Sequence, residues 1–173
     1  PLPISWKVRD IGRPLKGGQK IEDDSWVFYG GGDDIWNTND QFRYAYKKLD
    51  TDFSFSIKID SLYNVHQYAK AGLMVRKTLN PNSAHGLVNI FPSGNTEFGY
   101  RSSNGETMKA DSGPQIDLED ARLKIKKSRN IIEFFVSGAS NWEKIGELNI
   151  KKWGKSFYVG IATLSHDNSQ LTK

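Results

Sequence analysis

The segment FSFSIKID, residues 53–60, alternates apolar and polar residues with a period of two. In an extended chain its Phe and Ile side chains all point to one side, and its polar side chains point to the other. An amphipathic helix repeats every 3.6 residues, so this pattern predicts a β-strand with one buried face. A fold that contains such a strand has to pack the apolar side of a sheet against a second layer.

Segments of the same kind recur along the chain, separated by runs rich in Gly, Pro, Asn and Ser. Further strands are expected at residues 26–30, 42–49, 71–77, 85–91, 96–103, 122–128, 131–138, 142–150 and 157–165. Residues 128–130 predict a tight hairpin turn. Helical spacing is almost absent, and only residues 7–12 and part of 61–69 are candidates for a turn or two of helix. We therefore predict one all-β domain over residues 1–173, a two-sheet antiparallel β-sandwich of jelly-roll type with roughly 10 to 14 strands.

Composition narrows the class of protein further. A chain of 173 residues can bury about 70 % of the surface of its unfolded form, so it needs no cross-link to fold. The absence of cysteine excludes a disulfide scaffold and a thiolate metal site. The net charge of +4 is mild, and no apolar stretch approaches the length of a membrane span. We expect neither a nucleic-acid nor a membrane partner.

The first residues, PLPISW, contain neither an initiator Met nor a basic-then-apolar signal. Such a start is typical of a mature or excised part of a larger protein. We expect the domain to come from a secreted protein and to work outside the cell or in the cell envelope.

The strand expected at residues 71–77 sets Leu73 and Val75 on one face and Gly72, Met74 and Arg76 on the other. The first face suits the core between the sheets. The guanidinium of Arg76 offers five donors in a rigid fork, which matches vicinal hydroxyls or carboxylates. Two interpretations remain open. Arg76 lines a ligand cleft in which Gly72 leaves room, or it pairs with a nearby acid such as Glu97; we expect the cleft.

The loop at residues 30–46 is rich in side-chain oxygens, with five Asp and Asn residues within eight positions. These side chains can bind backbone N–H groups in a polar turn. They can also supply the six to eight oxygens that calcium prefers, with Asp34 and Asp40 as ligands, although the spacing is not that of an EF-hand. Contact with another ligand is the third interpretation.

Two more strands carry mixed signals. At residues 96–101, Glu97, Gly99 and Arg101 share a face opposite Tyr100, which suits either a sugar-binding strip or a solvated face with an ion pair. At residues 142–150, we expect the indole of Trp142 to pack back on its sheet.

Signatures of catalysis are missing from the sequence. The compact Glu-x-Asp-x-x-Glu strand of sandwich-fold glucanases does not occur, the three His residues are scattered, and no nucleophile elbow or Walker loop is present. If the protein is an enzyme, a glycoside hydrolase is the expected class, because such enzymes need only two acids across a cleft. Glu97 would then be the first candidate, with Asp34 or Asp40 as its partner.

Four phrases of the sequence, in order, resemble the regulation-of-enolase-like jelly-roll domain of the concanavalin A-like lectin/glucanase superfamily. These phrases are WKVRDIG (6–12), the stretch from Trp26 to Ile59, YAKAGLMVRKTLNPNSAH (68–85) and YVGIATLSHD (158–167). The resemblance covers nearly the whole chain. It implies the two-sheet fold, a sugar-related role, and a place beside secreted enzymes. In such domains the SH phrase is followed by a closing strand that is not found before Lys173, and the usual SSDGxxW turn is here SGASNW.

The resemblance also implies which polar residues matter. The positions that match its recurrent polar residues are Asp34, Trp36, Asp40, Lys70, Arg76, Arg101 and His166. We expect a non-catalytic carbohydrate-binding or accessory module, tethered to a parent enzyme, that binds a glycan on a concave sheet face. The expected ligand-binding residues are Asp34, Trp36, Lys70, Arg76, Tyr100, Arg101 and His166. No cofactor is expected apart from a structural calcium. The alternatives are a glycoside hydrolase or lyase on the same fold, and a structural protein-interaction module.

Overall fold

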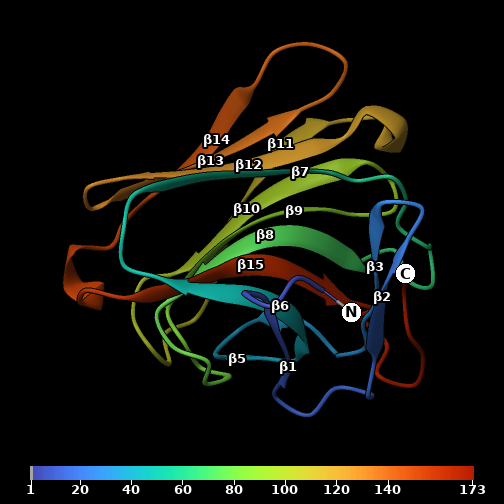
Figure 1. The fold of residues 1–173 in the computed structure, drawn as a ribbon, viewed down its shortest axis with the longest axis horizontal. Helices are drawn as coiled ribbons and strands as arrows, with labels where there is room; N and C mark the ends of the chain where they lie inside the picture. The colour runs from blue at the N-terminus through green and yellow to red at the C-terminus, as the bar shows by residue number, and fades with distance from the viewer. Residues whose placement is uncertain (1) are drawn as a thin grey trace.

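The protein is a sandwich of two antiparallel sheets (Figure 1). A computed structural model describes residues 2–173. The larger sheet contains, in order across it, β1 (Lys7–Ile11), β6 (Phe42–Leu49), β15 (Phe157–Leu164), β8 (Lys70–Arg76), β9 (His85–Ile90), β10 (Asn95–Arg101) and β11 (Lys109–Gln115). The smaller sheet contains β14 (Glu143–Asn149), β13 (Ile131–Ser137), β12 (Arg122–Ser128) and β7 (Phe53–Lys58). The all-β prediction is confirmed.

Two short hairpins and two 3₁₀ turns complete the fold. The hairpins are β2 (Gly18–Glu22) with β3 (Ser25–Tyr29), and β4 (Ile35–Trp36) with β5 (Asn39–Asp40). The 3₁₀ turns are η1 (Leu118–Asp120) and η2 (Lys151–Trp153). No helix among residues 2–173 is long and apolar enough to cross a membrane.

Both helical candidates were wrong. Residues 7–11 form β1, which pairs with β6, and residues 61–69 are turns and irregular chain. A helix of one or two turns is unstable on its own, so sheet hydrogen bonds outweigh its weak periodicity. Residues 111–115, DSGPQ, belong to β11, although their Gly, Pro and Ser residues are typical of the runs expected to separate strands. Pro114 is tolerated there because β11 is an edge strand and the missing N–H breaks no ladder.

The core between the sheets forms from the alternating residues of both layers. Leu73 and Val75 of β8 lie in it as predicted, opposite Leu123 and Ile125 of β12, and all four are fully buried. The two-residue turn between β12 and β13 is also confirmed, with Ser128 paired to Ile131. The strand patterns therefore predicted this core correctly.

The outer face of the larger sheet is covered, contrary to the expectation of an open cleft. Met74 and Leu87 pack there with Ile35 of the β4–β5 hairpin in a second buried apolar cluster. A Cβ on Gly72 would lie only 2.5 Å from the carbonyl oxygen of Val88 and 2.9 Å from the Cβ of Asn89. Gly72 therefore leaves room for the neighbouring strand, and not for a ligand.

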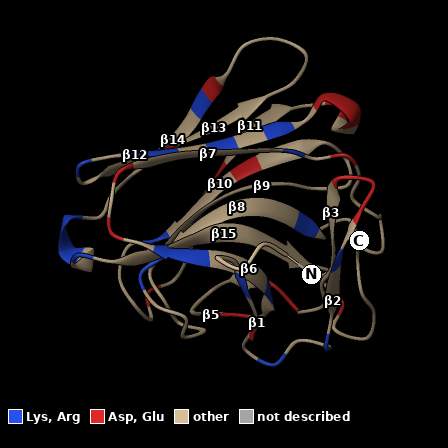
Figure 2. Ribbon diagram, viewed as in Figure 1, with Lys and Arg blue, Asp and Glu red and all other residues tan. Residues whose placement is uncertain are grey.

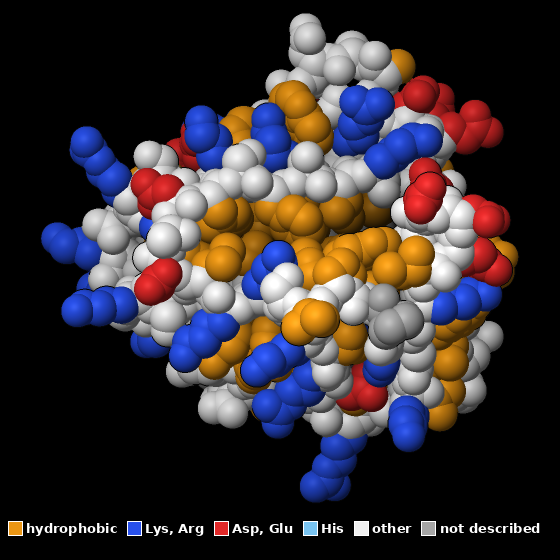
Figure 3. Space-filling view, viewed as in Figure 1, with side chains coloured by type: hydrophobic (Ala, Val, Ile, Leu, Met, Phe, Trp, Pro, Cys, Tyr) orange, Lys and Arg blue, Asp and Glu red, His pale blue; other side chains and the backbone are white. Residues whose placement is uncertain are grey.

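An apolar groove runs along one side of the sandwich, beside the edge strand β7 (Figure 3). Its volume is about 560 Å³, and Trp26, Phe55 and Ile161 help to line it. It is the surface that a protein-interaction module would use. Charged residues are distributed over both sheets, with an acidic turn between β2 and β3 (Figure 2).

Alternate side chains of β12 point into the core, so substitutions at the adjacent residues Arg122 and Leu123 should change the stability of the fold to different extents. Leu123→Ala should lower the free energy of unfolding by about 2–5 kcal/mol, because the buried side chain leaves a cavity. Arg122→Ala, on the exposed face, should change it by about 0.5 kcal/mol or less. Chemical denaturation of both variants measures the difference; equal losses would contradict the assigned faces.

Candidate functional site

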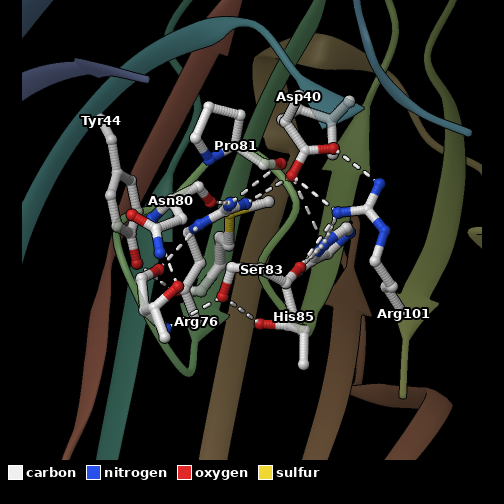
Figure 4. Close-up of polar contacts among 12 residues, drawn as sticks. Asp40, Tyr44, Arg76, Asn80, Pro81, Ser83, His85 and Arg101 are labelled. Atoms are coloured by element: carbon white, nitrogen blue, oxygen red, sulfur yellow. Dashed lines mark hydrogen bonds and ion pairs between the residues drawn. The ribbon is translucent and has the colours of Figure 1, made fainter. Parts of the chain in front are cut away.

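Two arginines of the larger sheet converge on one aspartate beneath the β4–β5 hairpin (Figure 4). Arg76 Nη1 donates to Asp40 Oδ2 at 2.7 Å, and Arg101 Nη2 donates to Asp40 Oδ1 at 2.9 Å. His85 lies beside them, with Nδ1 3.6 Å from Asp40 Oδ2. We call Asp40, Arg76, His85 and Arg101 the buried arginine cluster; all four side chains are 0 % exposed.

The guanidinium groups of both arginines also donate hydrogen bonds to backbone carbonyl oxygens. Arg76 Nε donates to Thr78 O at 3.3 Å and Nη2 donates to Asn80 O at 2.6 Å. Arg101 Nε donates to Glu106 O, and Nη2 also donates to Asn37 O, both at 2.8 Å. The two side chains thus fasten three loop segments to the sheet.

These contacts overturn the expectation that Arg76 lines an open cleft. Its side chain does lie on the outer face of the sheet, but the hairpin covers it, and its partner acid is Asp40 and not Glu97. Arg101 is covered in the same way. In this conformation neither guanidinium is available to a ligand, because every nitrogen already has a protein acceptor.

The cluster also argues against calcium at Asp40. Burial alone raises the pKa of this carboxyl, but the neighbouring positive charges of His85, when protonated, and of the two arginines outweigh it and hold the pKa below its usual value. Two guanidiniums repel a cation. Within residues 2–173, no group of three or more His, Cys, Asp and Glu side chains is arranged to hold a metal.

Removing the central charge should destabilise the fold strongly. Asp40→Asn leaves two buried guanidiniums without their counter-ion, so we expect a loss of about 3–5 kcal/mol in the free energy of unfolding. Asp33→Asn, an exposed position on the same loop, serves as the matched control and should be nearly neutral. Urea denaturation measures both; a small loss for Asp40→Asn would show that the cluster does not anchor the loops.

His85 is neutral at pH 7. The pKa of His85 is lowered from 6.5 to about 3, because burial disfavours the charged ring most strongly and the two arginines add to this effect, while the charge of Asp40 opposes it. Its Nδ1 lies 3.3 Å from both Ser83 O and Arg101 Nη1, and its Nε2 is buried without a partner among the described residues.

This depressed pKa makes stability depend on pH. Between pH 6.5 and 3 the unfolded chain binds a proton at His85 that the folded chain does not. The free energy of unfolding should therefore fall as the pH falls through this window, by about 1.4 kcal/mol per pH unit from this group. His85→Gln should flatten the slope, whereas the half-buried His66→Gln should keep it. Identical slopes for His85→Gln and the unaltered protein would contradict the assignment.

A second group of polar residues lies on the same face but reaches the surface. We call it the Lys70 site, and it consists of Asp34, Trp36, Lys70, Asn89, Glu97 and His166. Lys70 Nζ lies 2.5 Å from Asp34 Oδ1 and 5.6 Å from the centre of the Trp36 ring. His166 Nδ1 lies 3.4 Å from Asp34 Oδ2. Asn89 and Glu97 face each other across β9 and β10.

Local chain geometry brings these residues together. Lys70 is the first residue of β8, and His166 follows β15 with a left-handed φ of 59°. Gly32 has φ of 123°, and a Cβ there would lie 2.1 Å from Gln41 O, so only glycine allows the hairpin with Asp34 and Trp36 to fold over the sheet.

Burial and charge set the ionisation of the site. Burial raises the pKa of Glu97; the charge of Lys70 opposes this shift and that of Asp34 adds to it. Burial also lowers the pKa of His166, which Asp34 opposes. The ring of His166 lies 4.5 Å from that of His66. The site thus combines hydrogen-bonding groups with an indole that is 39 % exposed.

The structure separates the residues that sequence analysis had grouped. Asp34, Trp36, Lys70 and His166 meet in the Lys70 site, whereas Arg76 and Arg101 are buried beside it. Tyr100 was wrongly placed, because it lies on the opposite face of β10, stacked on Phe98 against the core between the sheets. Trp142 packs back on its own sheet as predicted, with its ring centre 4.2 Å from Lys124 Nζ.

Sequence analysis missed Asn89 and His85. They are the two polar residues of the otherwise apolar strand HGLVNI, and both are fully buried. A polar residue inside a strand that is apolar on both faces was the available signal, since buried polar groups require partners.

The fold resembles several solved structures. A functionally unknown protein from Saccharomyces cerevisiae has a TM-score of 0.70 at 12 % identity, covering 97 % of this chain and 91 % of that one. The carbohydrate binding module CBM66 from Bacillus subtilis has a TM-score of 0.56 at 10 % identity, over 97 % and 90 % of the chains. A legume lectin-like domain from Entamoeba histolytica has a TM-score of 0.58 at 12 % identity, over 97 % and 85 %.

At such identities the likeness establishes the fold alone, a two-sheet antiparallel jelly-roll sandwich. No protein-family model matches the sequence, and no curated protein matches it.

Proposed function

We propose that this domain is a non-catalytic carbohydrate-binding module whose glycan lies at the Lys70 site, on the outer face of the seven-stranded sheet. The observation that carries the proposal is the exposed indole of Trp36 beside the polar groups of Asp34 and Lys70. A sugar presents an apolar ring face and a rim of hydroxyls. It therefore suits a site that joins an aromatic surface to a few placed donors and acceptors.

The similar structures support this proposal, because a carbohydrate binding module and a lectin-like domain share the fold. We further propose that the chain is a regulation-of-enolase-like domain, on the four phrases of its sequence. A secreted origin and a parent enzyme to which the domain is tethered belong to the same proposal; a structural calcium ion, if one binds, lies away from Asp40 and its two arginines.

Trp36 should be required for binding. Screening a glycan array with and without calcium identifies the bound glycans, and titration calorimetry then gives their affinities. Trp36→Ala should weaken binding by about tenfold or more, equal to about 1.4 kcal/mol, because the stacking surface is lost. Trp142→Ala is the matched control, since that indole is 38 % exposed but lies on the other sheet. Equal effects of the two substitutions, or no bound glycan, would overturn the proposal.

A glycoside hydrolase is the second candidate, and the raised pKa of Glu97 near Asp34 favours it. A carboxyl with a raised pKa near a second carboxylate is the arrangement of a catalytic acid and its partner. However, Asp34 is already neutralised by Lys70. Release of reducing ends from the bound glycans, abolished in Glu97→Gln, would establish the enzyme; intact glycans after long incubation support binding alone.

A further inference from the structure

Asn89 is buried with unused hydrogen-bonding capacity. Its side chain is 0 % exposed, and neither its amide nitrogen nor its amide oxygen has a partner among the described residues. Native proteins satisfy nearly all buried polar groups, so an orphaned carboxamide needs an explanation outside the chain. The explanation has to be a molecule that brings both a donor and an acceptor.

Glu97 adds a second unused group at the same place. It pairs with Asn89 across β9 and β10, so the two side chains leave the sheet on one face with their Cβ atoms about 5 Å apart. Glu97 Oε1 is buried and also lacks a partner in residues 2–173. Together the two residues leave one amide nitrogen, one amide oxygen and one carboxylate oxygen without partners on the same face of the sheet, among the described residues.

The side chain of Lys70 lies close to Glu97, because its charge acts to lower the pKa of that carboxyl. Lys70 lies two positions before Gly72, the residue that pairs with Asn89 across β8 and β9. Its side chain is 4 % exposed, and its ammonium lies 5.6 and 5.8 Å from the ring centres of Trp36 and Phe91. We expect a ligand to displace the long Lys70 side chain from its ion pair with Asp34 and so to reach Asn89 and Glu97.

We propose that Asn89 and Glu97 form the floor of the sugar site and bind two neighbouring hydroxyls of a neutral sugar residue. A hydroxyl both donates and accepts, which suits an amide that offers N–H and C=O beside a carboxylate oxygen. The charge selects a neutral sugar, because Lys70 is neutralised by Asp34 and the carboxylate of Glu97 repels acidic sugars. The inference rests on the proposed function and goes further by assigning the specificity residues.

The decisive variant is Asn89→Leu, which has nearly the same shape but no polar atoms. Binding is measured by calorimetry with neutral oligosaccharides that end in glucose, galactose, mannose, xylose or fructose, and with matched uronic-acid oligosaccharides. We expect affinity for the best neutral ligand to fall by about tenfold or more. The thermal midpoint should stay the same or rise, because replacing an unsatisfied polar group with an apolar one costs no hydrogen bond.

Asn141→Leu is the matched control. Asn141 is exposed between β13 and β14 of the smaller sheet, so this substitution should leave binding unchanged. A lower thermal midpoint with unchanged affinity in Asn89→Leu would show that Asn89 only holds an internal water, and would overturn the inference. Glu97→Gln provides an independent test if Asn89→Leu does not fold. It should weaken neutral sugars several-fold and reduce discrimination against uronic acids; unchanged selectivity would also overturn the inference.

Trp36→Ala separates the two proposals. If this variant loses glycan binding while Asn89→Leu and Glu97→Gln keep it, the sugar site stands and the assigned floor is wrong. If the unaltered protein binds none of the oligosaccharides, the proposed function and the inference fall together.

Discussion

The arrangement of the outer face depends on one buried carboxylate. Asp40 accepts hydrogen bonds from Arg76 and Arg101, and the same guanidiniums bind the carbonyls of the loops around them. At neutral pH the cluster carries two positive charges and one negative charge, since His85 is uncharged. Carbonyl oxygens disperse the remaining positive charge. A sheet face that would otherwise be open is thereby closed by a short hairpin, in a register set by ion pairs.

The closed face creates the neighbouring site. The hairpin that ends at Asp40 also carries Asp34 and Trp36, so fastening one end of it fixes the other over β8 and β9. The buried arginine cluster and the Lys70 site differ in how many of their polar atoms have hydrogen-bond partners. In the buried arginine cluster every guanidinium nitrogen has an acceptor, whereas in the Lys70 site Asn89 and Glu97 have polar atoms that no other described residue contacts by a hydrogen bond. Fully hydrogen-bonded guanidiniums make the fold rigid, whereas buried polar atoms without partners are costly unless another molecule binds them.

The sequence patterns predicted the faces of the strands but not the loops that cover them. Strands with clear alternation, such as residues 53–58 and 122–128, were predicted within a residue or two, because period-two burial is a local property. Arg76 was placed on the correct face but in the wrong environment, since the strand that carries it gives no information about which loop covers it. The prediction that Tyr100 binds the ligand was wrong for a simpler reason. Tyr100 was correctly placed on the face of β10 opposite Arg101, but that face packs against the core between the sheets.

By itself, the sequence determined the class of fold, the faces of its strong strands and the list of polar residues from which a site could be built. These follow from alternation and composition, which act between near neighbours in the chain. Only the tertiary structure decided that Asp40 would meet Arg101, sixty-one residues away, and that Asn89 would have no partner within residues 2–173. Pairings over such separations depend on the order of strands in the sheet and on the path of the loops, and no local pattern encodes either.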